Sequence, residues 1–441
     1  MAEELTRRRL LGYGIGSIGT GIVGALPGLL LLIFLTDTLG VPAGWAGLIL
    51  LLPKACDVVL NPIVGALSDR STAAGGTRTP WLLAGSIGVP VLFAAMFAVP
   101  VTGVAAAAGW VAVAFLLATT AYSLYHVNYV ALPAEMTDDP RERTRIMTPR
   151  IILLTVGILI AGGLGPALSE TAGGGRAGHA VMGFVIGLIL LAAMVAATLG
   201  TRWVRSRPAS PLGLRASFAL ARGNRPFALL LTTYVLQSLA VSVMLAGAPY
   251  LATYRLDDYA LTSVLFVALV APSILVVPLW ARAANRFGKA PCLLVATAGY
   301  AVVTASLALT ASADRVWLVV GQVALLGCGY AALQLLAFSL LPDTISDDET
   351  RSGRRQAGAF TGVWTAGETL GAAAGPALYA AVLALSSFVS APADERVAQP
   401  DSAITGVLVG MTVVPVVLLA VSLPLLVRFA RTSRAGTAVP A

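Results

Sequence analysis

Twelve apolar stretches, each about 20 residues long or longer, run through this 441-residue chain. A helix of about 20 apolar residues is long enough to cross the hydrocarbon core of a bilayer. With 57% hydrophobic and only 11% charged residues, the chain has too few polar side chains to surround a soluble core. The sequence therefore predicts an all-α polytopic membrane protein with twelve transmembrane helices, near residues 10–36, 44–68, 81–101, 104–132, 147–169, 180–201, 226–254, 260–281, 290–310, 315–342, 354–387 and 401–430.

Basic residues gather in every second loop between these stretches. If the N-terminus is cytoplasmic, all but five of the 29 lysines and arginines are cytoplasmic, and the five are Lys54, Arg176, Arg255, Arg315 and Arg396. Loops rich in lysine and arginine stay on the cytoplasmic side. We therefore expect a multi-pass protein of the plasma or inner membrane with both termini cytoplasmic. The net charge of +8 is then a topology signal with attraction to anionic lipid, and nucleic acid is not an expected partner.

The chain repeats itself at a nearly constant offset. Residues 132–139 (LPAEMTDD) recur as 341–348 (LPDTISDD), and residues 165–168 (GPAL) recur as 375–378. Matches at one offset, in corresponding helices, indicate two pseudo-symmetric six-helix bundles related by duplication. The predicted parts are an N-terminal bundle at 1–201, a basic cytoplasmic linker at 202–225, and a C-terminal bundle at 226–441.

The second apolar stretch carries two opposite charges near its middle. Lys54, Asp57 and Asn61 follow one another at spacings of three and four residues, so they share one face of a helix. A charge at this depth costs about 2.5 to 3.5 kcal/mol on insertion scales, and such residues face protein or a wet cavity. The pattern is typical of an ion or substrate pathway.

A glycine-rich and basic motif follows the second stretch, and a degenerate copy follows the eighth. The first copy, residues 65–78, contributes Gly65, Asp69, Arg70 and Arg78; the second, residues 281–289, contributes Asn285 and Arg286. Small residues let helices approach closely, Asp69 can cap a helix or pair with an arginine, and the basic groups can lock a cytoplasmic gate. This motif resembles the loop motif of the major facilitator superfamily, whose fold has twelve helices in two halves.

Several further segments resemble the glycoside, pentoside and hexuronide:cation symporters, the melibiose permease family. They are Gly12–Gly16, Lys54–Gly65, Gly76–Trp81, Tyr129–Arg143, Pro149–Arg150 and Trp364–Glu368. The resemblance implies that Asp57 belongs to a sodium, lithium or proton site. It also implies a sugar site that includes Arg150.

This chain departs from the family pattern where the chemistry matters. Asn61 stands in place of the second aspartate of the cation site, and a single carboxylate beside Lys54 holds a hard cation less well than two do. Thr20 and Gly21 stand where the melibiose transporters have lysine and aspartate, and His126 replaces an aspartate. Proton coupling at Asp57, or loss of coupling, is therefore favoured over sodium coupling, and a galactoside is a less fitting substrate.

Polar groups inside the apolar stretches are the candidates for contact with substrate. Tyr122, Tyr125, His126 and Tyr129 form a stripe that is either a substrate wall or interhelical packing. Arg150 either binds substrate or extends to lipid headgroups, and Glu368 either takes part in coupling or forms a static ion pair. The residues selected as substrate-binding are His126, Arg150, Tyr122, Thr20, Trp364 and Glu368.

These features together predict a secondary active transporter, working as a monomer and without a cofactor. Proton or sodium movement would drive symport of a glycoside or related small polar or anionic solute by alternating access. The alternative is a proton-coupled exporter of a drug-like or secondary metabolite. An enzyme or a sensor is not supported, because the sequence offers no nucleophile triad, metal-ligand cluster, phosphate loop or large soluble domain.

Overall fold

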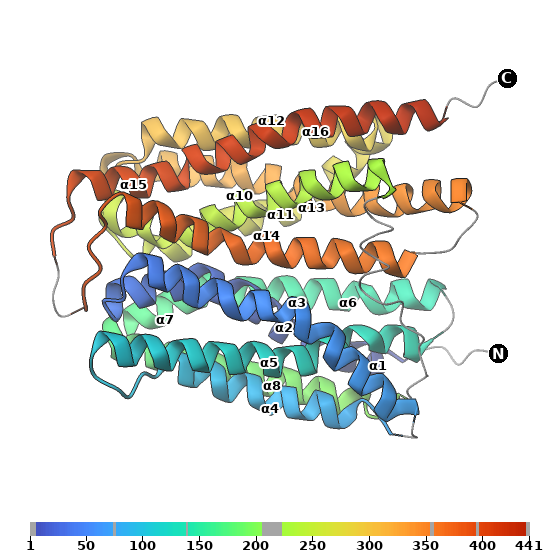
Figure 1. Cartoon of the computed structure of the whole chain (residues 1–441), viewed down its shortest axis with the longest axis horizontal. Coiled ribbons are helices and arrows are strands. Elements are labelled where there is room, and N and C mark those ends of the chain that lie inside the picture. The colour runs from blue at the N-terminus through green and yellow to red at the C-terminus, as the bar shows by residue number, and fades with distance from the viewer. Residues whose placement is uncertain are drawn as a thin grey trace. The chain divides into compact units, whose positions relative to one another are not determined.

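The computed structural model describes residues 6–73, 76–137, 140–204, 223–352, 357–393 and 397–437. Within these ranges the chain is almost entirely helical, and twelve helices are long and apolar enough to cross a membrane. The prediction of an all-α protein with twelve membrane-spanning segments is confirmed (Figure 1). The predicted linker, 202–225, lies mostly outside the described residues.

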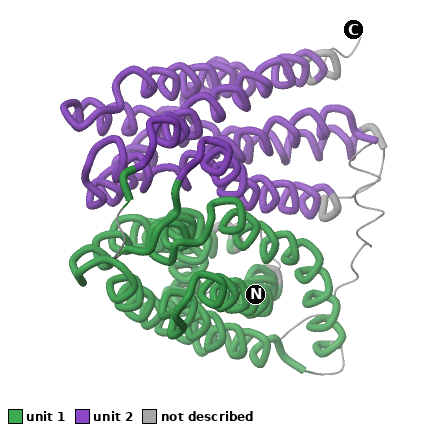
Figure 2. The backbone as a smooth tube through the Cα atoms, turned by 60° about the vertical axis from the view of Figure 1, so that its left-hand side comes forward, with its two compact units in different colours: residues 1–211, 389–398 green, residues 212–388, 399–441 purple. Residues whose placement is uncertain are grey.

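The chain divides into two compact units (Figure 2): residues 1–211 with 389–398 form unit 1, and residues 212–388 with 399–441 form unit 2. The helices of unit 1 are α1 (Arg7–Gly14), α2 (Gly16–Leu26), η1 (Pro27–Leu31), η2 (Phe34–Thr38), α3 (Ala43–Ala73), α4 (Thr79–Phe97), α5 (Val104–Met136), α6 (Pro140–Leu159), η3 (Ile160–Leu164), α7 (Gly165–Thr171) and α8 (Gly175–Thr201). The helices of unit 2 are α10 (Arg225–Arg255), α11 (Leu261–Phe287), α12 (Lys289–Thr310), η4 (Ala313–Arg315), α13 (Val316–Ser352), α14 (Ala357–Leu385), α15 (Asp401–Met411) and α16 (Val413–Thr437).

The first predicted span is not one regular helix. The Thr6 side chain caps α1 by accepting a hydrogen bond from the backbone N–H of Arg9, and α1 gives way to α2 at Ile15. Beyond α2 the chain winds as two short π-helical pieces, η1 and η2, of which η1 begins at Pro27. Each π-helical turn contains an extra residue, so it changes which side chains share a helix face.

Glycine allows α2 and α6 of unit 1 to pack backbone against backbone. A Cβ atom at Gly21 would overlap the backbone oxygen of Leu154, and one at Gly157 would overlap the backbone oxygen of Ile18. Gly24, one turn after Gly21 on α2, has open space where its Cβ would lie. Close approach therefore depends on Gly21 and Gly157, as in other membrane helix pairs built on small residues.

Unit 2 has its own apolar core, in which α10 is central. The side chain of Asn224 caps α10 by accepting a hydrogen bond from the backbone N–H of Phe227, at 2.9 Å. Helix α10 lies against α14 and α16, and α11 lies against α13. Aromatic side chains fill the interior, including Phe227 and Phe360, whose ring centroids are 4.8 Å apart.

Residues 389–398 belong to unit 1 although they follow α14 of unit 2 in the chain. Pro392 forms an isolated antiparallel bridge with Leu39, directly after η2, and the N–H of Ala393 donates to the carbonyl oxygen of Thr38 at 3.4 Å. Gly40 adopts a φ of 71° beside Pro392, and an added Cβ there would lie 2.8 Å from the proline ring. The predicted boundaries, which give all of 226–441 to the second bundle, do not anticipate this return.

Candidate functional site

Asp57 lies on α3 of unit 1 and is only 4% exposed. Two polar side chains contact its carboxylate, both at long range: Lys54 Nζ lies 3.8 Å from Oδ2, and the hydroxyl of Ser123 on α5 donates to Oδ1 at 3.4 Å. Hydrogen bonds to a carboxylate are usually about 2.7 to 2.9 Å, so neither partner holds Asp57 tightly. A buried carboxylate held this loosely can accept a proton or a small cation.

Lys54 connects Asp57 to two of the predicted aromatic residues of α5. Its ammonium group lies 5.9 Å from the centre of the Tyr122 ring, and Tyr122 stacks on His126 with the ring centroids 5.0 Å apart. Asn61 is half-buried one turn beyond Asp57. The structure therefore brings Lys54, Asp57, Tyr122 and His126 together as one polar group of side chains within unit 1.

Tyr125 and Tyr129 have a different environment from the other two members of the stripe. The Tyr129 hydroxyl donates to the backbone oxygen of Tyr13 at 2.8 Å and lies 2.7 Å from the Ser17 hydroxyl, which must then donate to it. Tyr129 also stacks on Tyr13 and Tyr125, at centroid distances of 4.6 and 5.2 Å. This half of the stripe is helix packing against the first span.

Two further predicted residues of unit 1 have mainly local contacts. Thr20 is 6% exposed, and its hydroxyl donates to the backbone oxygen of Ser17 at 3.1 Å. Arg150, half-buried on α6, places Nη1 3.5 Å from the sulfur of Met147. Of the two, Arg150 keeps more capacity for a ligand, because a guanidinium has five N–H donors.

Arg78, which lies between α3 and α4, joins the ends of three helices. It is 5% exposed and donates to Glu135 Oε1 and Asp69 Oδ1, each at 2.7 Å. Its Nη1 also donates to the hydroxyl of Ser68 at 3.1 Å and to Asn128 Oδ1 at 3.0 Å. Burial lowers the pKa of Arg78, but the hydrogen bonds to Glu135 and Asp69 outweigh burial, so its pKa lies above the usual arginine value.

In unit 1 the structure brings together only some of the predicted gate residues. In unit 2 the ion pair at the corresponding place is formed by residues other than the predicted ones. Arg70 is exposed at the end of α3 and is not among the partners of Arg78. In unit 2, Asn285 and Arg286 are exposed at the end of α11. The ion pair there joins Lys289 Nζ and Asp343 Oδ2 at 2.6 Å. Lys289 is the last residue of the predicted copy of the motif, 281–289, but was not among its predicted gate residues, and Asp343 lies outside that copy.

The two predicted substrate-binding residues of unit 2, Trp364 and Glu368, both contact Tyr234. The Tyr234 hydroxyl is 2.9 Å from Glu368 Oε1, and the Tyr234 ring stacks on Trp364 with centroids 4.5 Å apart. Trp364 is 1% exposed, and its indole Nε1 is buried without a hydrogen-bond partner. Tyr234 is thus the side chain that organises this group.

Sequence reasoning missed three residues that complete these sites: Ser123, Asn128 and Glu135. Ser123 directly follows Tyr122 on α5 and reaches Asp57. Asn128 and Glu135 both lie in the C-terminal half of α5, and Glu135 is part of the repeated segment 132–139. Both copies of the repeat place an acidic residue directly after or near the Leu-Pro pair, Glu135 in 132–139 and Asp343 in 341–348, and this recurrence was the available signal for Glu135.

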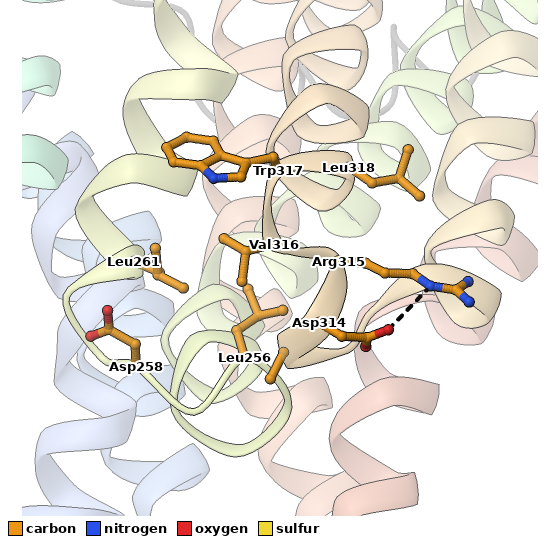
Figure 3. Close-up of a pocket in the computed structure, with 9 residues that line it drawn as sticks. Leu256, Asp258, Leu261, Asp314, Arg315, Val316, Trp317 and Leu318 are labelled. Atoms are coloured by element: carbon orange, nitrogen blue, oxygen red, sulfur yellow. Dashed lines mark ion pairs between the residues drawn. The ribbon is translucent and has the colours of Figure 1, made fainter.

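Other kinds of site find little support in the described part of the chain. Among those residues, no group of three or more histidine, cysteine, aspartate or glutamate side chains is placed to hold a metal ion. A surface pocket in unit 2 is lined by the connection between α10 and α11, by η4 and by the start of α13, including Asp258, Asp314, Arg315 and Trp317 (Figure 3). None of the predicted site residues lines this pocket.

Known proteins resemble this chain over nearly its whole length. A model of the family described as MFS/sugar transport protein matches residues 12–432. YagG of Escherichia coli K12, described as a candidate glycoside/cation symporter, is 26% identical over 432 residues, covering 95% of this chain and 90% of that protein. A candidate sulfoquinovose importer of Salmonella typhimurium LT2 is 25% identical over 418 residues, covering 91% and 85%. The crystal structure of a bacterial homolog of the human lysosomal transporter Spinster, inward-facing and occupied, has a TM-score of 0.71 at 14% identity and covers 98% of each chain, which shows a common fold.

Proposed function

Because this chain belongs to the MFS/sugar transport family, we propose that it is a proton-coupled symporter of a glycoside or a related small polar or anionic solute. The observation that carries the proposal is Asp57: a carboxyl group, 4% exposed in a membrane-spanning helix, whose contacts to Lys54 and Ser123 are both long. A charge in such a position is costly and marks ion pathways. Transport would follow alternating access, in which the solute site opens to one side of the membrane at a time.

The donor set around Asp57 supports a proton as the coupling ion. Sodium is a hard cation that needs several oxygen ligands, and Asp57 supplies the only carboxylate of this group. The ammonium group of Lys54 would compete with a metal cation for that carboxylate. A proton needs only one oxygen atom, and it releases Lys54 from the ion pair when it binds.

The same group of side chains suggests the solute. When Asp57 is protonated, the positive charge of Lys54 is no longer balanced within the pair, so an anionic group of a solute is attracted. The stacked rings of Tyr122 and His126 offer a flat polar surface suited to a sugar ring. The names of the two relatives, a glycoside/cation symporter and a sulfoquinovose importer, are consistent with a glycoside or a related solute.

Replacing Asp57 with asparagine tests the coupling. The amide keeps the size of the side chain but cannot bind and release a proton. We expect Asp57→Asn to abolish solute accumulation driven by a proton gradient in reconstituted vesicles, while exchange of labelled for unlabelled solute continues. The probes are labelled glycosides and hexuronides, with sodium present or absent.

Glu170 on α7 of the same unit has an exposed carboxyl group, so Glu170→Gln is the matched control. This variant should keep gradient-driven accumulation. If the Asp57→Asn protein still accumulates solute in response to the gradient, Asp57 is not the coupling group.

A second candidate function, proton-coupled export of a drug-like metabolite, is favoured by one observation. Gly21, which stands where the melibiose transporters have aspartate, packs against the backbone of α6, and Thr20 is buried. The first span therefore lacks the polar groups that bind a galactoside in that family. Counterflow of sugars, compared with counterflow of hydrophobic cations in the same vesicles, separates the two functions.

A further inference from the structure

Four polar side chains from three helices of unit 2 form a continuous hydrogen-bonded chain. Glu368 of α14 is linked to Tyr234 of α10 at 2.9 Å, and Tyr234 is linked to Gln334 of α13 at 3.2 Å. Gln334 is linked in turn to Tyr330, one turn earlier on α13, at 3.2 Å. This hydrogen-bonded chain ties α10, α13 and α14 together, and its member Tyr234 stacks on the ring of Trp364.

The Tyr234 hydroxyl has one proton but faces two acceptors. Both Glu368 Oε1 and Gln334 Oε1 lie within hydrogen-bond distance of it. A phenol donates one hydrogen bond and accepts others. The chain can therefore be satisfied completely only if one neighbour donates to Tyr234 while Tyr234 donates to the other.

Two arrangements satisfy every member, and they differ by one proton. With Glu368 ionised, Tyr234 donates to Glu368, the amide N–H of Gln334 donates to Tyr234, and Tyr330 donates to the amide oxygen of Gln334. With Glu368 protonated, Glu368 donates to Tyr234, Tyr234 donates to Gln334 Oε1, and Gln334 Nε2 donates to Tyr330. The orientation of the Gln334 amide in the structure is that of the second arrangement.

We propose that Glu368 is a second proton-binding site, independent of Asp57, and that its protonation reverses the hydrogen-bonded chain that ends at Tyr330. In the ionised state the Tyr330 hydroxyl proton is engaged by Gln334, and only oxygen lone pairs remain for a ligand. In the protonated state Tyr330 is free to donate its hydrogen bond. Resting on the proposed function, this links proton binding in unit 2 to recognition of an acceptor oxygen, such as a carboxylate or sulfonate oxygen of the solute.

Among the described residues of unit 2, the groups that contact or face Glu368 are members of this hydrogen-bonded chain. The titratable groups that face Glu368 from the neighbouring helices of unit 2 are the phenols of Tyr234 on α10 and Tyr330 on α13. In the described residues no lysine, arginine or histidine forms an ion pair with it. The charged residues of α10 are Arg225 and Arg255, at its two ends, and α15 carries only Asp401, at its start.

The acidic residues of α13 lie near its C-terminal end, away from the residues that contact Glu368. The first acidic residue of that helix, Asp343, lies nine positions after Gln334, or about 13 Å along the axis at the helical rise. Without a cation to stabilise the carboxylate, the energetic difference between the two protonation states depends on the Tyr234 hydrogen bond. Protonation of Glu368 is then a local event that the hydrogen-bonded chain transmits.

Infrared difference spectroscopy of the purified full-length protein tests the proposal without any solute or gradient. The carbonyl stretch of protonated carboxyl groups is recorded as the pH is raised through the range in which the protein stays folded. We expect one protonated-carboxyl band that Glu368→Gln removes and Asp57→Asn keeps. Tyr234→Phe, which leaves the carboxyl group but removes its partner, should shift that band to higher frequency.

The proposal is overturned if Glu368→Gln leaves every protonated-carboxyl band in place, or if Tyr234→Phe leaves the band of Glu368 unshifted. The Tyr234→Phe result stands even if the Glu368→Gln protein fails to fold. Because the measurement uses the proton itself as the probe, it is separate from the vesicle assay of Asp57. Glu368 can bind a proton in a protein whose coupling at Asp57 is disproved, and the reverse also holds.

Discussion

Arg78→Ala is expected to destabilise the folded protein by about 3 to 5 kcal/mol, the cost of breaking a buried ion pair by removing one partner. Glu135, whose side chain is 6% exposed, would keep its negative charge without a cation, and its Oε2 atom already has no hydrogen-bond partner. Asn128 and Ser68 would each lose a donor as well. The measurement is the unfolding midpoint of the purified protein in detergent, converted to a free energy with a denaturant series.

Arg70→Ala is the matched control for this substitution. Arg70 lies at the end of α3 in the same loop motif but is exposed, so its loss should change stability by no more than about 0.5 kcal/mol. Arg78→Lys keeps the charge but loses the forked donors that reach Glu135 and Asp69 together, so an intermediate loss is expected. Equal midpoints for Arg78→Ala and Arg70→Ala would contradict the structural role of Arg78.

Gly21→Ala is expected to cost about 1 to 3 kcal/mol, although alanine is the better helix former. The added methyl group would meet the backbone oxygen of Leu154 on α6, and backbone atoms cannot turn aside as a flexible side chain can. The helices would have to separate, which disturbs the packing along their whole contact. Thermal unfolding in detergent measures the loss.

Gly24→Ala, on the same helix, provides the comparison. The new Cβ would lie in open space, so the substitution should be neutral or stabilise by roughly 0.5 to 1 kcal/mol through helix propensity. The prediction depends on the difference between the two variants. If Gly24→Ala lowers the unfolding midpoint as much as Gly21→Ala, close packing of α2 on α6 is not what Gly21 provides.

The sequence predicted the membrane-spanning helices because the length of an apolar run is a local property of the chain. It did not predict the breaks in the first span, since a π-helical turn such as η1 arises from how a helix packs and leaves no repeat in the sequence. Pro27 was visible, but proline alone does not specify which kind of irregular turn follows.

Helical spacing predicted which site residues share a face of one helix, but not which residues of other helices they contact. Helical spacing placed Lys54 and Asp57 on one face of α3, and in the structure Lys54 Nζ lies 3.8 Å from Asp57 Oδ2. It could not divide the aromatic stripe of α5, because Tyr122 and Tyr129 differ in the helices that they contact. Partners from distant segments were also out of reach: Arg78 and Glu135 are 57 residues apart in the chain.

Glu368 shows the same limit in unit 2. A glutamate within an apolar stretch was recognisable as a candidate, and a basic partner was among the expected explanations. Its described partner is a phenol from another helix, Tyr234, 134 residues away in the chain. Which neutral group stabilises a buried acid depends on helix packing that spacing alone does not specify.

The return of residues 389–398 to unit 1 means that the two units are not two consecutive fragments of polypeptide. A protease that cut the chain between α8 and α10 would release an N-terminal piece without the segment that bridges Leu39 through Pro392. Neither product would contain a complete unit 1. Attempts to express the halves separately should therefore supply this decapeptide to the N-terminal piece.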